Sequence, residues 1–125
     1  MKVRVAVASS DGKVVNRHFG HTNQFLVFEL SDGVFNFVES RENVPTCRTG
    51  RHELSDLAAT AEVIKDCAYV VASRVGSGAA SVLLDKGIRA YVDADFIENT
   101  LQKLFESGKL KYLLRRKEAD FEKIE

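Results

Sequence analysis

Tryptophan is absent from this sequence of 125 residues, proline and methionine occur once each, and cysteine occurs twice. Two cysteines allow one disulfide at most, and a chain of this length buries roughly 65–70% of its unfolded surface without needing one. We therefore predict that Cys47 and Cys67 are thiols and that a hydrophobic core holds the fold. The sequence also lacks the run of about 18 apolar residues that spans a bilayer, and its first residues lack the apolar stretch of a signal peptide. We expect a cytoplasmic protein.

The sequence has no excess charge of either sign, because 18 lysines and arginines balance 18 aspartates and glutamates. A neutral chain has no global electrostatic attraction to nucleic acid or to an anionic membrane, so we expect neither as a partner. Any preference for an anion must therefore come from a local arrangement of charges.

The apolar segments that are present follow the pattern of an α/β protein. Alternating or continuous apolar runs predict strands at 2–8, 24–30, 34–40, 68–73 and 88–92. Helical spacing and glycine stops predict helices over 52–66, from the glycine turn at 76–78 to Gly87, and over 93–108, with Asp at its start. An Asp-Gly turn at 32–33 makes a hairpin of the second and third strands. We expect a mixed five-stranded sheet, built from this hairpin and parallel βαβ units and flanked by helices.

The residues best suited to bind a metal gather in the two segments that least resemble regular structure. They are His18, His21, Cys47 and His52. Each of these residues, taken alone, is as readily explained by a structural role. Both segments, however, can reach the carboxyl end of the sheet, where ligands bind in such folds. Paired cysteines for a zinc site are lacking, and two cysteines are too few for a four-thiolate cluster. We predict a cluster held partly by other groups, with His18 and Cys47 as metal ligands and the other two histidines assisting.

Positive charge surrounds these candidate ligands. The arginines concerned are Arg17, Arg41, Arg48, Arg51 and Arg74. They are either ordinary solvated side chains or complements to an anion. The turn at 76–78 lets backbone N–H groups approach an anion at a helix N-terminus. We predict an anion-binding set of Arg17, Arg48, Arg51, Arg74, Gly76 and Gly78.

Two alternatives remain for the other chemistry-bearing residues. The glycine turn departs from the dinucleotide fingerprint at its third glycine, so it is either a tight strand-to-helix turn or part of a nucleotide-binding regulatory module, with Asp93 as a ribose-binding acid. Cys67 precedes a buried strand and is expected in the core, with a role as cluster ligand as the alternative. The first strand carries no carboxylates of the kind that a metal-dependent nuclease uses, and the sequence has no glycine elbow around a nucleophile. We therefore do not expect an enzyme.

Four segments together identify a family: "NRHFGH" at 16–21, "TCRTGRH" at 46–52, "DC" at 66–67 and "SRVGSG" at 73–78. They resemble the dinitrogenase iron–molybdenum cofactor biosynthesis family, which includes NifX and the C-terminal domain of NifB. The resemblance implies a ribonuclease H-like fold without nuclease activity, which binds or carries a labile iron–sulfur or iron–molybdenum type cluster between a donor and an acceptor protein. It assigns a cluster-binding role to His18. The radical chemistry of NifB belongs to a separate domain, so we expect no catalysis.

The family domain is expected to cover residues 1–108, followed by a helical extension at 109–125. Its apolar residues have helix-like spacing and are Leu110, Leu113, Leu114, Phe121 and Ile124. The extension either packs on its own domain or docks on a second subunit. We expect a monomer or a weak homodimer.

Overall fold

The computed structural model describes residues 3–43 and 54–110. Within these residues, five strands form one sheet in the order β3-β2-β1-β4-β5. They are β1 (Val3–Ala8), β2 (Gln24–Ser31), β3 (Val34–Glu42), β4 (Tyr69–Ala72) and β5 (Arg89–Val92). The strand β2 runs antiparallel to β1 and β3, whereas β4 runs parallel to β1 and β5. The expected mixed α/β sheet is confirmed.

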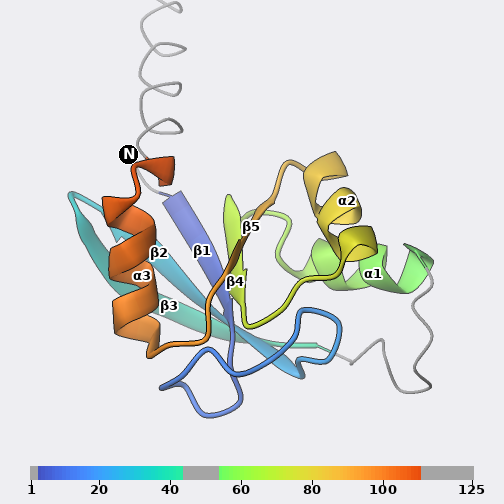
Figure 1. Ribbon diagram of the computed structural model, residues 1–125, viewed down its shortest axis with the longest axis horizontal. Coiled ribbons are helices and arrows are strands. Elements are labelled where there is room, and N and C mark those ends of the chain that lie inside the picture. Colours follow the sequence, from blue (N-terminus) through green and yellow to red (C-terminus); the bar gives the residue numbers. More distant parts are fainter. Residues whose placement is uncertain (1–2, 44–53, 111–125) are drawn as a thin grey trace, which may run out of the picture.

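In the described part of the chain, three helices cover the two faces of this sheet: α1 (Leu54–Val63), α2 (Ser77–Asp85) and α3 (Ile97–Glu106). The helices α1 and α2 lie on one face and α3 lies on the other (Figure 1). The alternation along β1 explains this arrangement. Ala6 and Ala8 contribute to the core under α1 and α2, while Val5 and Val7 contribute to the core under α3. Both faces of the central strands β1 and β4 are buried, as their nearly continuous apolar sequences predict.

The hairpin turn forms as its sequence predicts. Asp32 and Gly33 have φ angles of 53° and 78°, and the flanking Ser31 and Val34 pair across the turn. Two successive positive φ angles match the right-handed twist of the strands, and Asp-Gly tolerates them. The register of β2 and β3 shifts between Val27 and Phe28, which marks an irregularity in this hairpin.

The last described helix begins later than predicted. Its first residue is Ile97, and residues 93–96 before it are not helical. Asp93 and Asp95 cap no helix, and both accept an ion pair from Lys103 on α3. The side chain of Asp95 also accepts a hydrogen bond from the backbone N–H of Phe96. Aspartates satisfy nearby backbone donors in extended turns as readily as at helix starts, so sequence alone misplaces the boundary.

Part of the predicted C-terminal extension lies outside the described residues. Its first apolar position, Leu110, is fully buried in the core under α3. No helix within residues 3–43 and 54–110 is long and apolar enough to cross a membrane.

Candidate functional site

The long loop after β1 is hydrogen-bonded to the segments that follow β4 and β5. The N–H of Val15 donates to the carbonyl of Asp95 over 2.9 Å, and the N–H of Ile97 donates to the carbonyl of Lys13 over 2.9 Å. Further along the loop, the N–H of Phe19 donates to the carbonyl of Arg74 over 3.0 Å. These bonds make the loop a fixed part of the sheet's end and place His18 beside Arg74.

The two histidines of the loop lie side by side. The carbonyl of His18 accepts hydrogen bonds from the N–H groups of His21 and Thr22, at 3.0 and 3.1 Å, which closes a tight turn. The imidazole rings of His18 and His21 stack with centroids 5.2 Å apart and planes inclined by 24°. Between them in sequence, Phe19 is only 1% exposed and packs on Phe25 in the core. The buried ring therefore anchors the turn while both imidazoles stay exposed.

The N-terminus of α2 faces the same region. Its cap residue Gly76 offers no side-chain hydrogen bond to the first turn, so the first N–H groups have no capping side chain. A Cβ atom at Gly76 would meet nothing within 4 Å, and one at Gly78 would lie at an ordinary 3.7 Å from Leu57. Since neither packing nor φ requires glycine here, we interpret the two glycines as keeping the helix N-terminus accessible.

A pocket of about 450 Å³ brings these groups together. Five predicted site residues line it, namely His18, His21, Arg74, Gly76 and Gly78. The remaining lining residues were not predicted and are Phe19, Gly20, Leu57, Ser77 and Ala79. The first two lie within the histidine motif, which could have indicated them, whereas Leu57 carried only the signal of a core helix residue. The structure thus joins two segments that the sequence separates by more than fifty residues.

Other predicted site residues are not brought together. Arg17 does not line the pocket, and its carbonyl accepts a hydrogen bond from the N–H of Ser73 over 3.0 Å. Cys47, Arg48, Arg51 and His52 lie outside the described residues, and their roles stay predictions. Among the residues that the structure describes, no group of three or more His, Cys, Asp or Glu side chains is arranged to hold a metal ion. The described donor set is therefore a pair of imidazoles.

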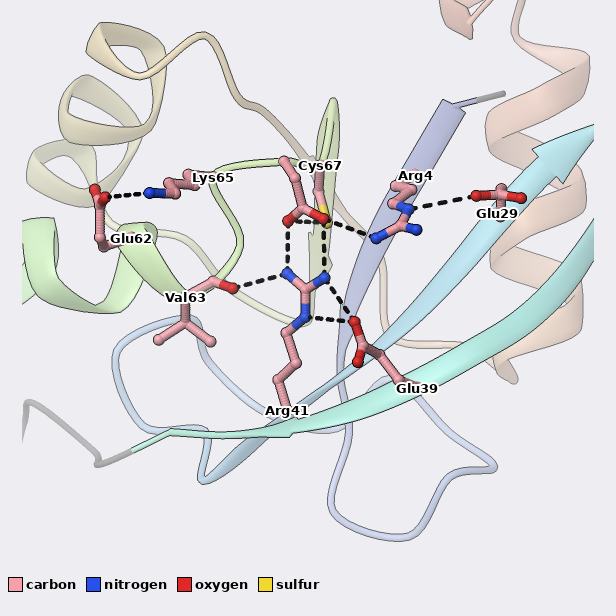
Figure 2. Close-up of polar contacts among 9 residues, drawn as sticks. Arg4, Glu29, Glu39, Arg41, Glu62, Val63, Lys65 and Cys67 are labelled. Atoms are coloured by element: carbon pink, nitrogen blue, oxygen red, sulfur yellow. Dashed lines mark hydrogen bonds and ion pairs between the residues drawn. The ribbon is translucent and has the colours of Figure 1, made fainter. Parts of the chain in front are cut away.

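Arg41 corrects one sequence expectation, because carboxylates already occupy it. Its guanidinium donates to both carboxylate oxygens of Asp66, to Glu39 and to the carbonyl of Val63. Figure 2 shows Arg41 reaching from β3 to the carbonyl of Val63. A second arginine, Arg4, donates to Asp66 over 2.9 Å. Arg41 thus joins β3 to the end of α1 and does not serve as an anion-binding arginine.

The carboxylate at the centre of this cluster should make stability sensitive to acid. Hydrogen bonds from Arg41 hold the pKa of Asp66 well below its ordinary value, although burial opposes them. Because folding favours the ionised form, this contribution is present above the unfolded pKa and is lost as pH falls through the folded pKa. We expect Asp66→Asn to lower the free energy of unfolding at pH 7 by about 1 kcal/mol, since the pair is partly solvated, and to flatten the loss of stability in acid.

Urea denaturation of wild type and variant between neutral and strongly acidic pH measures both effects. Asp85→Asn is the matched control, because Asp85 is an exposed aspartate on α2. Equal stability of Asp66→Asn and wild type at pH 7 would contradict the assignment.

The structure confirms Cys67 as a core residue with a free thiol. The side chain is 4% exposed, and burial raises its pKa to about 12, with the neighbouring carboxylate of Asp66 adding to the effect. A thiol of this kind is a poor nucleophile and a poor metal ligand at neutral pH. The alternative role of Cys67 as a cluster ligand has no support in this geometry.

Thiol titration tests the burial of Cys67. In a Cys47→Ala background, we expect no reaction of the native protein with a disulfide reagent at pH 8, because the thiol is both covered and protonated. Unfolding in guanidinium should expose one thiol per chain. Rapid reaction of the native protein would show that Cys67 is accessible.

Asp93, considered as a ribose-binding acid, has other partners. Its carboxylate accepts hydrogen bonds from Thr100 at 3.0 Å and from Lys103 at 2.9 Å, which hold its pKa below the ordinary value. It does not line the pocket beside Gly76. The nucleotide alternative therefore lacks its expected acid at this site.

Comparison with known proteins gives one family match. The family described as dinitrogenase iron-molybdenum cofactor matches residues 1–107. The chain is similar to the FeMo cofactor biosynthesis protein NifB of Frankia alni, with 32% identity over 105 residues that cover 82% of this chain and 21% of that protein. It is also similar to NifB of Azotobacter vinelandii, with 36% identity over 90 residues that cover 70% and 18%. The chain spans about a fifth of the length of these relatives.

Solved structures include proteins of the same fold. The apo form of the orange protein from Desulfovibrio gigas superposes with a TM-score of 0.63 at 20% identity, covering 83% of this chain and 88% of that chain. This likeness supports the α/β fold described above.

Proposed function

The chain belongs to the dinitrogenase iron-molybdenum cofactor family, and from this premise we propose that it binds and carries a metal–sulfur cluster in the pocket between the histidine turn and α2. One observation carries the proposal. Two stacked imidazoles, the residue Arg74 and the uncapped start of a helix converge on a single pocket of about 450 Å³. The cluster is the protein's cargo, received from a donor protein and passed to an acceptor.

The chemistry of the described groups suits an anionic cluster. Imidazole nitrogen is a ligand for iron and copper and a hydrogen-bond donor to sulfide. The guanidinium of Arg74 and the first N–H groups of α2 favour negative charge in the same pocket. Two imidazoles cannot complete the coordination of a metal, so a cluster that brings its own sulfides fits better than a bare ion. Cys47, as predicted from the sequence, would add a thiolate.

We also propose a fold type, a cellular location and an oligomeric state for this protein. The ribonuclease H-like assignment is supported by the strand order, in which β2 runs against its neighbours. A binding role without a catalytic step, a cytoplasmic location and a monomer or weak dimer are proposed with it.

Anaerobic loading tests the proposed binding. Wild type is incubated with ferrous iron and sulfide, or with tetrathiomolybdate, then desalted and analysed by absorption and metal content. We expect uptake by wild type and little by His18→Ala/Cys47→Ala. The control is Arg89→Ala, a change on β5 outside the pocket. Equal uptake by wild type and the double variant would refute the proposal.

The alternative function, a nucleotide-binding regulatory module, draws on the open N-terminus of α2. It predicts thermal stabilisation by a nucleotide or by inorganic phosphate that survives in His18→Ala/Cys47→Ala. Gly78→Val should remove this stabilisation, because Gly78 lines the pocket at the start of α2. Absence of stabilisation in wild type would dispose of this alternative.

A further inference from the structure

A polar residue outside the pocket closes the far end of the histidine turn. Thr22 is fully buried and does not line the pocket, and a buried hydroxyl costs free energy unless it is hydrogen-bonded. Its Oγ1 donates to the carbonyl of Gln24 over 2.6 Å, and its backbone N–H donates to the carbonyl of His18 over 3.1 Å. Thr22 therefore joins the turn to the first residue of β2.

Asn43 reaches the same turn from β3, whose last residue is Glu42. The backbone N–H of Asn43 donates to the carbonyl of Asn23 over 2.9 Å. Its side-chain Nδ2 donates to the carbonyl of Thr22, also over 2.9 Å. Two hydrogen bonds to neighbouring carbonyls fix the direction of this stretch of chain as well as its position, because hydrogen bonds are directional.

The histidine turn is thus held on two sides. On one side the loop pairs with Arg74, next to His18. On the other side Asn43 holds the carbonyl of Thr22, the residue that directly follows His21. Each imidazole therefore lies close to a separate attachment.

We propose that Thr22 and Asn43 are positioning residues of the pocket, which keep the imidazole of His21 beside that of His18. Neither residue lines the pocket, so both act through the backbone of the turn. The inference rests on the proposed function, because the two stacked rings, with centroids 5.2 Å apart, are the metal-binding groups of the described site. Groups that orient metal ligands without touching the metal still influence the affinity for it.

The two attachments predict an unequal effect on the two histidines. Loss of the hydrogen bond from Asn43 frees the end of the turn that carries His21, whereas His18 keeps its pairing with Arg74. Asn43→Ala should therefore displace the ring of His21 more than the ring of His18. A general loss of stability would disturb both rings alike, so this difference separates positioning from a purely structural role.

Nuclear magnetic resonance of the full chain without cluster measures the ring contact. Wild type should show cross-relaxation between ring protons of His18 and His21, because the rings stack. We expect this signal to be lost in Asn43→Ala, which removes the side-chain donor, and in Thr22→Val, which keeps the branched shape but removes the hydroxyl. It should persist in Thr22→Ser, which restores the hydroxyl, and in Asn36→Ala, the matched control at an exposed position of β3.

Titration of the same proteins with tetrathiomolybdate, followed by absorption, provides the second measurement. We expect Asn43→Ala and Thr22→Val to lower the affinity about tenfold, and Thr22→Ser and Asn36→Ala to bind like wild type. A ring signal that survives in both Asn43→Ala and Thr22→Val would overturn the proposal, and so would a lost signal with unchanged affinity. Wild type that binds no tetrathiomolybdate would refute the proposed function instead, and the ring signal would still decide whether the two residues position the imidazoles.

Discussion

His18→Ala is expected to weaken cluster binding by at least about tenfold, because losing a side chain near a bound metal typically lowers the affinity for the metal by this much. His18 lies in the part of the loop that is bonded to the end of β4, next to Arg74, and its ring lines the pocket. His21 follows on the turn that closes over the carbonyl of His18. We therefore expect His21→Ala to have a smaller effect than His18→Ala. Equilibrium titration of the apo protein with tetrathiomolybdate, followed by absorption, measures both.

The control for this prediction separates loss of a ligand from loss of the pocket. Circular dichroism and thermal unfolding of His18→Ala should match wild type, because the side chain is exposed. The assignment fails if His18→Ala binds as tightly as wild type, or if His21→Ala alone abolishes binding.

Phe19→Ala is expected to lower the free energy of unfolding by about 3–5 kcal/mol. The ring is 1% exposed, lies in the core under α1 and α2, and meets Phe25 with centroids 5.9 Å apart. Its removal leaves a cavity below the histidine turn and frees the turn that presents both imidazoles. Cluster binding should therefore weaken together with stability.

Urea denaturation of Phe19→Ala measures this loss. Phe37→Ala is the matched control, because Phe37 is 58% exposed and should cost much less. Equal destabilisation by the two changes would contradict the view that Phe19 anchors the loop.

The elements of the fold follow from local patterns in the sequence. The alternation in β1 and the Asp-Gly turn at 32–33 are determined by residues a few positions apart, so both were predictable. The start of α3 was not predictable, because the side chains of Asp93 and Asp95 pair with Lys103, which lies eight to ten residues further along the chain. A boundary that depends on such contacts leaves no local signal.

The candidate site, like the fold, was predictable only in part from the sequence. His18, Gly76 and Gly78 stand out in the sequence because of their residue types, and the structure places them around one pocket. The engagement of Arg41 by Asp66 joins residues 25 positions apart, so the sequence could not distinguish Arg41 from an anion-binding arginine. Residue type indicated the chemistry, and only tertiary contacts determined which charged groups remain available to a ligand.

Anaerobic purification followed by elemental analysis tests whether this chain carries a metal–sulfur cluster in the pocket at His18. Wild type and His18→Ala are expressed and purified side by side without exposure to air. We expect iron or molybdenum together with inorganic sulfide in wild type, and a large loss of both in the variant. Wild type free of metal and sulfide, or equal contents in the two proteins, would contradict it.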